Sequence, residues 1–140
     1  MALSRQAMFF LVVPFVVFPG LLIWRRPAHW DAVHVAGLVL TIAGIAMITV
    51  ARLQLGNSFS VTPQARKLIT TGVYRRIRNP IYVFGEMTIV GLLLYAAPLK
   101  LLWLAAALIP VQVLRARAES RTLETKFGDE YRAWKQTTWF

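Results

Sequence analysis

Four apolar stretches alternate with polar stretches along the 140-residue chain. Residues 6–24 and 33–51 contain no acidic, lysine or arginine side chain. A third stretch, 80–97, is interrupted by Glu86, and a fourth covers 99–114. About 20 apolar residues in a helix cross a hydrocarbon core of about 30 Å, so each stretch is close to spanning length. The pattern predicts an all-α integral membrane fold with four transmembrane helices.

A secretory signal peptide is the alternative interpretation of residues 6–24. A signal peptide has a shorter apolar core and a cleavage site made of small residues. Here the stretch ends in Trp24, Arg25 and Arg26, which is typical of an anchor at the membrane interface. We therefore expect a span that stays in the mature protein.

Local signals predict how the other spans pack and end. Small residues in the second stretch favour close helix packing: Gly37, Ala43, Gly44 and Ala46. Pro98 and Lys100 allow a tight turn, so the third and fourth spans should form a helical hairpin. The fourth helix is expected to continue beyond the membrane to a cap at Gly128, followed by a short amphipathic helix. Tyr131 and Trp134 of that helix would rest on the membrane interface.

Composition excludes several classes of protein. The chain is 57% hydrophobic and 16% charged, whereas soluble domains average about 45–50% and about 25%. So apolar a chain is not disordered, and it is a poor candidate for an ordinary nucleic-acid-binding module despite a net charge of +10. The absence of cysteine excludes disulfides, thiolate metal sites and a cysteine nucleophile.

The basic residues predict the orientation of the spans. Segments 52–79 and 115–140 each contain six lysine or arginine residues. The positive-inside rule places both segments in the cytoplasm, and four spans then place the N-terminus there as well. Arg25 and Arg26 oppose this orientation but are outnumbered. We expect a multi-pass membrane protein with both termini in the cytoplasm.

Two carboxylates are candidates for chemistry. Glu86 lies inside the third span, where an ionisable side chain costs about 2.5–3.5 kcal/mol on insertion scales and therefore suggests a functional site. Tyr82 lies one helical turn before it on the same face. Glu119 follows the fourth span by about one turn. The structural alternatives are that Glu86 pairs with an arginine or is protonated, and that Glu119 forms a surface ion pair with Arg115.

Five short motifs follow one another in a fixed order: Leu55-Gly56, Thr71-Gly72-Val73-Tyr74-Arg75, Arg78-Asn79-Pro80-Ile81-Tyr82, Glu119-Ser120-Arg121-Thr122-Leu123 and Phe127-Gly128-Asp129-Glu130-Tyr131. In this order and spacing they resemble the integral-membrane methyltransferases that include isoprenylcysteine carboxyl methyltransferases and phospholipid N-methyltransferases. The resemblance covers roughly residues 55–134. We expect a single membrane domain, 1–140, with its cofactor-binding part in this region.

The chain departs from the family pattern at three positions. Asn79 replaces the usual histidine, but asparagine also donates and accepts hydrogen bonds. It can additionally cap the third helix, with Pro80 in the first turn. Ser120 replaces a second glutamate, which puts a carboxylate role at that position in doubt. Phe84 stands where glycine is common, with Gly85 one residue later, and this change could narrow or shift the route by which a lipid enters.

The resemblance implies S-adenosylmethionine as the methyl donor and implies no metal. The implied cofactor-binding residues are Gly72, Tyr74, Arg75, Arg78, Asn79, Pro80, Tyr82, Glu119 and Leu123. Glu119 would accept hydrogen bonds from the ribose hydroxyls or the amine. Arg75 or Arg78 would pair with the cofactor carboxylate. Tyr82 would pack against the adenine or the sulfonium cation.

The resemblance also implies a lipophilic acceptor that enters from the bilayer between the third and fourth helices. The implied catalytic residues are Arg78, which would neutralise a carboxylate acceptor, and Glu86, which would take a proton from an amine acceptor. The expected partners are this acceptor and membrane lipids, without nucleic acid. So small a four-helix core is also compatible with a homodimer.

Two other functions fit part of the pattern. Sterol-type membrane reductases have a similar carboxyl-terminal hairpin that binds NADPH, but they have more spans before it. A non-enzymatic scaffold whose basic segments bind anionic lipid would explain the charge and the spans. It would leave the order of the five motifs to coincidence. DNA binding is a remote third, because the arginines flank apolar spans and do not line one soluble face.

Overall fold

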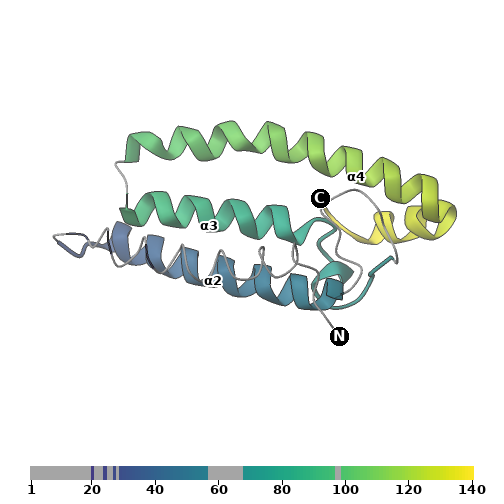
Figure 1. Ribbon diagram of the computed structural model, residues 1–140, viewed down its shortest axis with the longest axis horizontal. Helices are drawn as coiled ribbons and strands as arrows, with labels where there is room; N and C mark the ends of the chain where they lie inside the picture. The colour runs from purple at the N-terminus through teal and green to yellow at the C-terminus, as the bar shows by residue number, and fades with distance from the viewer. Residues whose placement is uncertain (1–19, 21–23, 25–26, 28, 57–67, 97–98) are drawn as a thin grey trace.

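The computed structural model describes residues 20, 24, 27, 29–56, 68–96 and 99–140. Within these residues the chain is helical and contains no strand beyond one isolated bridge (Figure 1). Its elements are α2 (Ala32–Leu55), η2 (Gly72–Arg75), α3 (Pro80–Ala96), η3 (Leu99–Leu101) and α4 (Leu102–Thr137). Helices therefore occupy the second, third and fourth apolar stretches. Apart from Gly20 and Trp24, the expected span 6–24 lies outside the described residues.

Two helical stretches, Ala32–Leu55 and Leu99–Thr137, are long and apolar enough to cross a membrane. Pro80–Ala96 is a shorter apolar helix. Large apolar side chains are exposed on the outer faces of α2 and α4, among them Val39, Ile42, Trp103, Ile109 and Leu114. Many exposed large apolar side chains on apolar helices are typical of contact with lipid.

The ends of α2 follow from local chemistry. The Asp31 side chain caps the helix by accepting a hydrogen bond from the His34 backbone N–H at 2.9 Å. The helix ends before Gly56, which has a φ of 49°. It therefore runs beyond the predicted limit at residue 51, because no residue before Gly56 interrupts it. As a result, Arg52 and Gln54 belong to α2 and not to the loop that follows.

Helices α2 and α3 lie side by side and pack almost backbone to backbone (Figure 1). A Cβ atom on Gly91 would lie 2.6 Å from the Thr41 backbone nitrogen, and one on Gly37 would lie 2.7 Å from the Gly91 carbonyl oxygen. Gly44 is equally close to Thr88. The prediction that Gly37 and Gly44 form a packing face is confirmed.

Ala43 and Ala46 do not belong to this packing face, because both are exposed. Thr41 and Thr88 are buried at the contact in their place. Each hydroxyl donates a hydrogen bond to a carbonyl of its own helix, Thr41 to Gly37 at 2.8 Å and Thr88 to Phe84 at 2.7 Å. Satisfying the hydroxyls within each helix lets these polar residues lie in an apolar contact.

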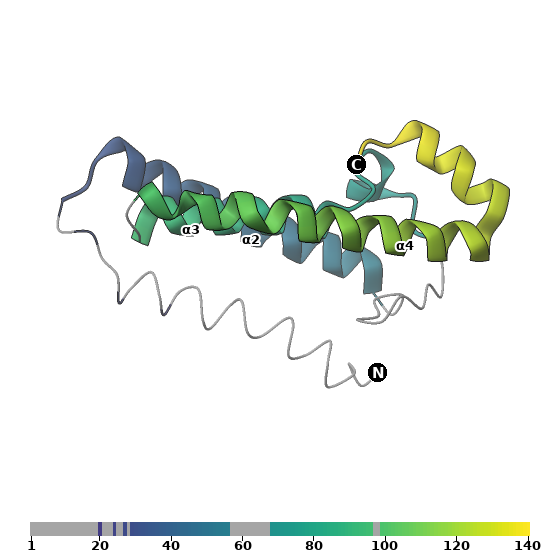
Figure 2. The ribbon, with the colours of Figure 1, turned by 90° about the horizontal axis from the view of Figure 1, so that it is seen from above.

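Helix α4 reverses direction at Gly128, which has a φ of 51°. Figure 2 shows the chain turning there, so that its last part returns toward the start of α3. A left-handed conformation of this kind is readily available only to glycine. The predicted continuation of the fourth helix to Gly128, with a further helix behind it, is confirmed.

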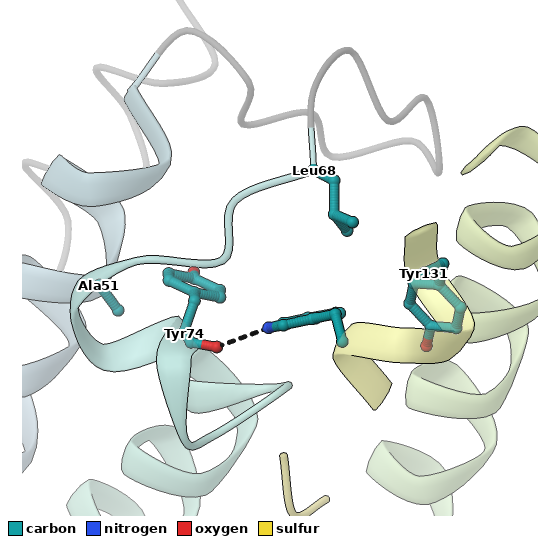
Figure 3. Packing of buried hydrophobic residues seen from close by; sticks show 5 residues of the cluster. Ala51, Leu68, Tyr74 and Tyr131 are labelled. Carbon is teal, nitrogen blue, oxygen red and sulfur yellow. Dashed lines mark hydrogen bonds between the residues drawn. The ribbon is translucent and has the colours of Figure 1, made fainter. Parts of the chain in front are cut away.

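The hydrophobic core lies at this end of the molecule, where the returning segment meets η2 and the end of α2. The core consists of Ala51, Leu68, Tyr74, Tyr131 and Trp134 (Figure 3). The Tyr131 and Trp134 rings meet edge to face with centroids 5.6 Å apart. The expectation that these two aromatics rest on the membrane interface is therefore wrong. The reversal at Gly128 turns them inward, where large aromatic surfaces are removed from water.

Candidate functional site

A polar cluster around Glu119 lies where α3 and α4 meet, beside η2. The Tyr82 hydroxyl on α3 interacts with the Glu119 carboxylate on α4 and lowers the pKa of that carboxyl. Arg115, one turn earlier on α4, attracts the same carboxylate electrostatically. Tyr74 of η2 interacts electrostatically with both Glu119 and Arg52. Residues of α3, α4 and η2 therefore interact with one carboxylate, and Arg52 of α2 interacts with this cluster through Tyr74.

Glu119 lies beyond the apolar part of α4 but is itself largely shielded from solvent. Burial raises the pKa of this carboxyl, while the hydrogen bond from Tyr82 and the charge of Arg115 partly offset the effect. Burial also raises the pKa of the Tyr74 phenol, with a smaller contribution from Glu119. Glu119 thus interacts with Tyr82 as well as with Arg115, and the alternative of a surface ion pair with Arg115 did not anticipate Tyr82.

The η2 turn depends on Gly72, whose φ is 62°. The Gln54 carboxamide of α2 accepts a hydrogen bond from the Val73 backbone N–H at 2.8 Å. A Cβ on Gly72 would lie 2.4 Å from this carboxamide and would push it away. Gln54 was missed by sequence reasoning, because it stood in a segment predicted to be loop. It links the end of α2 to the turn that places Tyr74.

Substituting Gly72 by alanine should destabilise the protein by about 2–3 kcal/mol. About 1–2 kcal/mol comes from the left-handed backbone, and the remainder from the lost hydrogen bond between Gln54 and Val73. Thermal unfolding in detergent measures the effect. The matched control is Gly56→Ala, because Gly56 also has a positive φ of 49°, but no heavy atom of the described residues lies within 4 Å of its Cβ position. Equal losses for both variants would contradict the role assigned to Gln54.

The start of α3 is held by the end of the chain. The Tyr82 and Val83 N–H groups donate to the Asn79 carbonyl at 3.1 and 3.3 Å, so Asn79 occupies the cap position and Pro80 the first turn. The Asn79 N–H in turn donates to the Phe140 carbonyl oxygen at 2.9 Å. No sequence signal identifies this partner, because a backbone hydrogen bond does not depend on side-chain type.

Backbone hydrogen bonds also join Arg76 and Arg78 to Trp139. The Arg78 N–H donates to the Trp139 carbonyl at 3.1 Å, and the Trp139 N–H donates to the Arg76 carbonyl at 3.0 Å. In addition, the Trp134 indole donates to the Tyr74 carbonyl at 3.0 Å (Figure 3). The segment that carries Arg78 is therefore fixed from two sides.

The two candidate anion-binding arginines differ in their surroundings. Arg75 is exposed. Arg78 is partly buried, and within the described part of the chain its buried Nε has no hydrogen-bond partner. A buried donor without an acceptor is costly, so Arg78 is the better placed of the two to receive an anionic group.

Glu86 pairs with an amide and not with an arginine. The Gln112 Nε2 on α4 donates to Glu86 Oε2 at 2.5 Å. The alternative interpretation, in which Glu86 pairs with an arginine, is therefore not found among the described residues. Gln112 was missed as a site residue, although it is the only amide side chain in the apolar stretch 99–114 and could have been noticed on that ground.

The remaining predicted residue, Leu123, is partly buried and packs against the hydrophobic core. The structure thus brings Tyr74, Tyr82 and Glu119 into one cluster. Glu86 is one helical turn from Tyr82 on α3. Leu123 lies on the core side of α4, one turn after Glu119.

A family model described as phospholipid methyltransferase matches residues 32–130 of the chain. The match begins at the first residue of α2 and ends just after the reversal at Gly128, so it includes every residue of the polar cluster. No curated protein and no solved structure matches the chain.

Proposed function

Because the chain belongs to the phospholipid methyltransferase family, we propose that it transfers a methyl group from S-adenosylmethionine to a lipophilic acceptor in the membrane. The observation that carries the proposal is the shielded Glu119 carboxylate, which Tyr82 holds where two apolar helices meet. Membership of a family of membrane methyltransferases disfavours the reductase and the scaffold that the sequence left open.

The described residues fit the chemical groups of S-adenosylmethionine. Glu119 would accept hydrogen bonds from the ribose hydroxyls or the amine, and Arg78, whose Nε is buried without an acceptor among the described residues, would bind the carboxylate. The partly buried Tyr82 ring would offer a face that attracts a sulfonium cation or packs on adenine. When bound, this cofactor supplies an electrophilic methyl group on a sulfur that leaves with the C–S electron pair.

The protein residues would then have to align the acceptor and exclude water, because methyl transfer is an in-line displacement. Tyr74 belongs both to the polar cluster and to the buried hydrophobic core, so the core would exclude water on that side of the cluster. With an amine acceptor, the proton that nitrogen loses would pass to Glu86. With a carboxylate acceptor no proton moves, and Arg78 would neutralise the charge until the ester forms.

The proposal includes a multi-pass arrangement with four spans, in which the polar cluster faces the cytoplasm. The described parts of both basic segments support this orientation, because they lie at the same end of the helices (Figure 1). The cofactor-binding part would occupy about residues 55–134 of a single domain. The acceptor would approach from the bilayer between α3 and α4, and a homodimer is compatible with this arrangement.

Incubation of the purified protein with methyl-labelled S-adenosylmethionine and a total lipid extract tests the function. We expect label in the lipid fraction. Base-labile label indicates a methyl ester, and base-stable label on a head group indicates N-methylation. The absence of labelled product, or binding of NADPH in place of S-adenosylmethionine, would contradict the proposal. For a base-stable product, an unchanged rate in Glu86→Gln would exclude proton removal by Glu86.

A further inference from the structure

The contact between α3 and α4 contains a half-satisfied carboxylate. Gln112 occupies one oxygen of Glu86, Oε2. The other oxygen, Oε1, is buried and has no hydrogen-bond partner among the described residues. An acceptor atom left without a donor in apolar surroundings carries a penalty of about 1–3 kcal/mol. A bound group that donates a hydrogen bond to Oε1 would remove this penalty.

The pair lies next to the polar cluster, on its apolar side. Glu86 is one turn further into α3 than Tyr82, which corresponds to about 6 Å along the helix axis. On α4, Gln112 precedes Arg115 by one turn and Glu119 by two. Tyr82 and Glu119 join the same two helices as Glu86 and Gln112. The two cross-helix pairs are therefore neighbours along one contact.

Gln112 restricts what Glu86 can do. The amide donor at 2.5 Å restrains the carboxylate and occupies one acceptor site of Oε2. Oε1 remains as an acceptor, and a partner at this oxygen must bring an N–H or O–H group. An anionic head group would be repelled by the carboxylate. The geometry therefore selects for a hydrogen-bond donor.

We propose that Gln112 is a positioning residue, which orients Glu86 so that Oε1 receives the N–H or O–H donor of the acceptor head group. This inference rests on the proposed methyl transfer and adds where the acceptor head lies and which residue sets that place. The competing explanation is that the pair only joins α3 to α4. Polar pairs between membrane helices contribute about 0.6 kcal/mol on average, so such a role is also physically reasonable.

Exchanging the two side chains separates these explanations. The variants are Glu86→Gln, Gln112→Glu and the double variant that carries both changes. In the double variant an amide and a carboxylate of the same size still face each other, so the cross-helix hydrogen bond can form again. Its carboxylate, however, now stands on α4. We measure thermal unfolding in detergent, S-adenosylmethionine binding by calorimetry, and kcat and KM for the acceptor.

We expect the double variant to recover wild-type thermal stability and S-adenosylmethionine binding. Its turnover should stay at least about tenfold below wild type, which corresponds to the 1.4 kcal/mol of one hydrogen bond in the transition state. A further variant, Gln112→Leu, keeps Glu86 but removes the donor. It should raise the KM for the acceptor and leave the affinity for S-adenosylmethionine unchanged.

Three candidate methyl acceptors show which group donates the hydrogen bond to Oε1: a long-chain amine, a long-chain alcohol and a long-chain carboxylate. Methylation of the amine or the alcohol supports the inference and assigns the N–H or the O–H donor. Preference for the carboxylate would overturn it. Full turnover by the double variant would also overturn it, because the pair would then serve only to join the helices. If the wild type itself transfers no label, the proposed function fails. That result differs both from preference for the carboxylate and from full turnover by the double variant, which overturn only the inference about Gln112.

Discussion

Replacing Glu119 by glutamine should weaken S-adenosylmethionine binding by about 100-fold. A hydrogen bond to a charged group contributes about 1.5–3 kcal/mol, and a loss of about 2.7 kcal/mol corresponds to that factor. Glutamine has the size of glutamate and keeps an oxygen that can accept the Tyr82 hydroxyl, so the helices should stay in place. Calorimetric titration of the detergent-solubilised protein measures the dissociation constant.

The matched control is Glu130→Gln, because Glu130 is an exposed carboxylate on the segment after Gly128. The Glu130→Gln variant also removes one negative charge from α4. Its dissociation constant for S-adenosylmethionine should stay within about twofold of the wild-type value, since exposed charges contribute little. An equal loss in both variants would show that net charge alone governs binding. An unchanged dissociation constant for Glu119→Gln would exclude Glu119 as a cofactor ligand.

The pH dependence of binding gives an independent reading of the same residue. Burial raises the pKa of Glu119 above that of an ordinary glutamate. In the proposed function the ionised form of Glu119 would accept hydrogen bonds from S-adenosylmethionine, so the affinity should decline as the pH falls through this raised pKa. An ordinary glutamate would lose its charge only at lower pH. Glu119→Gln should remove this dependence.

Substituting Gly91 by alanine should destabilise the pair formed by α2 and α3 by about 1–3 kcal/mol, the usual range for overpacking a tight contact. The new Cβ would meet the Thr41 backbone nitrogen at 2.6 Å and the Gly37 carbonyl oxygen at 2.8 Å. Backbone atoms cannot move aside as the end of a side chain can, so the two helices must separate. A lower midpoint of thermal unfolding in detergent is the expected result.

Gly85→Ala is the control for this substitution. Gly85 lies in the same helix, and within the part of the chain that the structure describes no heavy atom lies within 4 Å of its Cβ position. Alanine is favoured over glycine inside a helix by about 1 kcal/mol, so this variant should be as stable as the wild type or more so. If both alanine variants behave alike, close packing at Gly91 does not hold α2 against α3.

The helices could be predicted because their signals are local. Apolar stretches, the cap at Asn79 and Pro80, and the glycine at residue 128 each act on their own neighbourhood. The extension of α2 past residue 51 was missed because a change to polar composition was taken as a helix end. A helix ends where its backbone is interrupted, and here this occurs at Gly56.

The site was predictable in part. The motifs named Tyr82 and Glu119, and the structure joins them. What the motifs could not supply is the partner across a long separation. The pairing of Gln112 with Glu86 depends on how α4 lies against α3. The pairing of Trp139 with Arg78 depends on the reversal of the chain at Gly128. The same reversal buries Tyr131 and Trp134. The sequence predicted both residues at the membrane interface, because buried and interfacial aromatic residues cannot be told apart from sequence alone.

The backbone of residues 76–79 forms hydrogen bonds with Trp139 and Phe140, which are synthesised last among the described residues. The Trp134 side chain that bonds to the Tyr74 carbonyl lies 60 residues later in the chain. A nascent chain that has completed α2 and α3 therefore lacks the partners of η2 and of the Arg78 segment. Contacts so far apart in sequence form late. The arrangement of η2 and the Arg78 segment is thus complete only once the whole of α4 has been synthesised and has folded back.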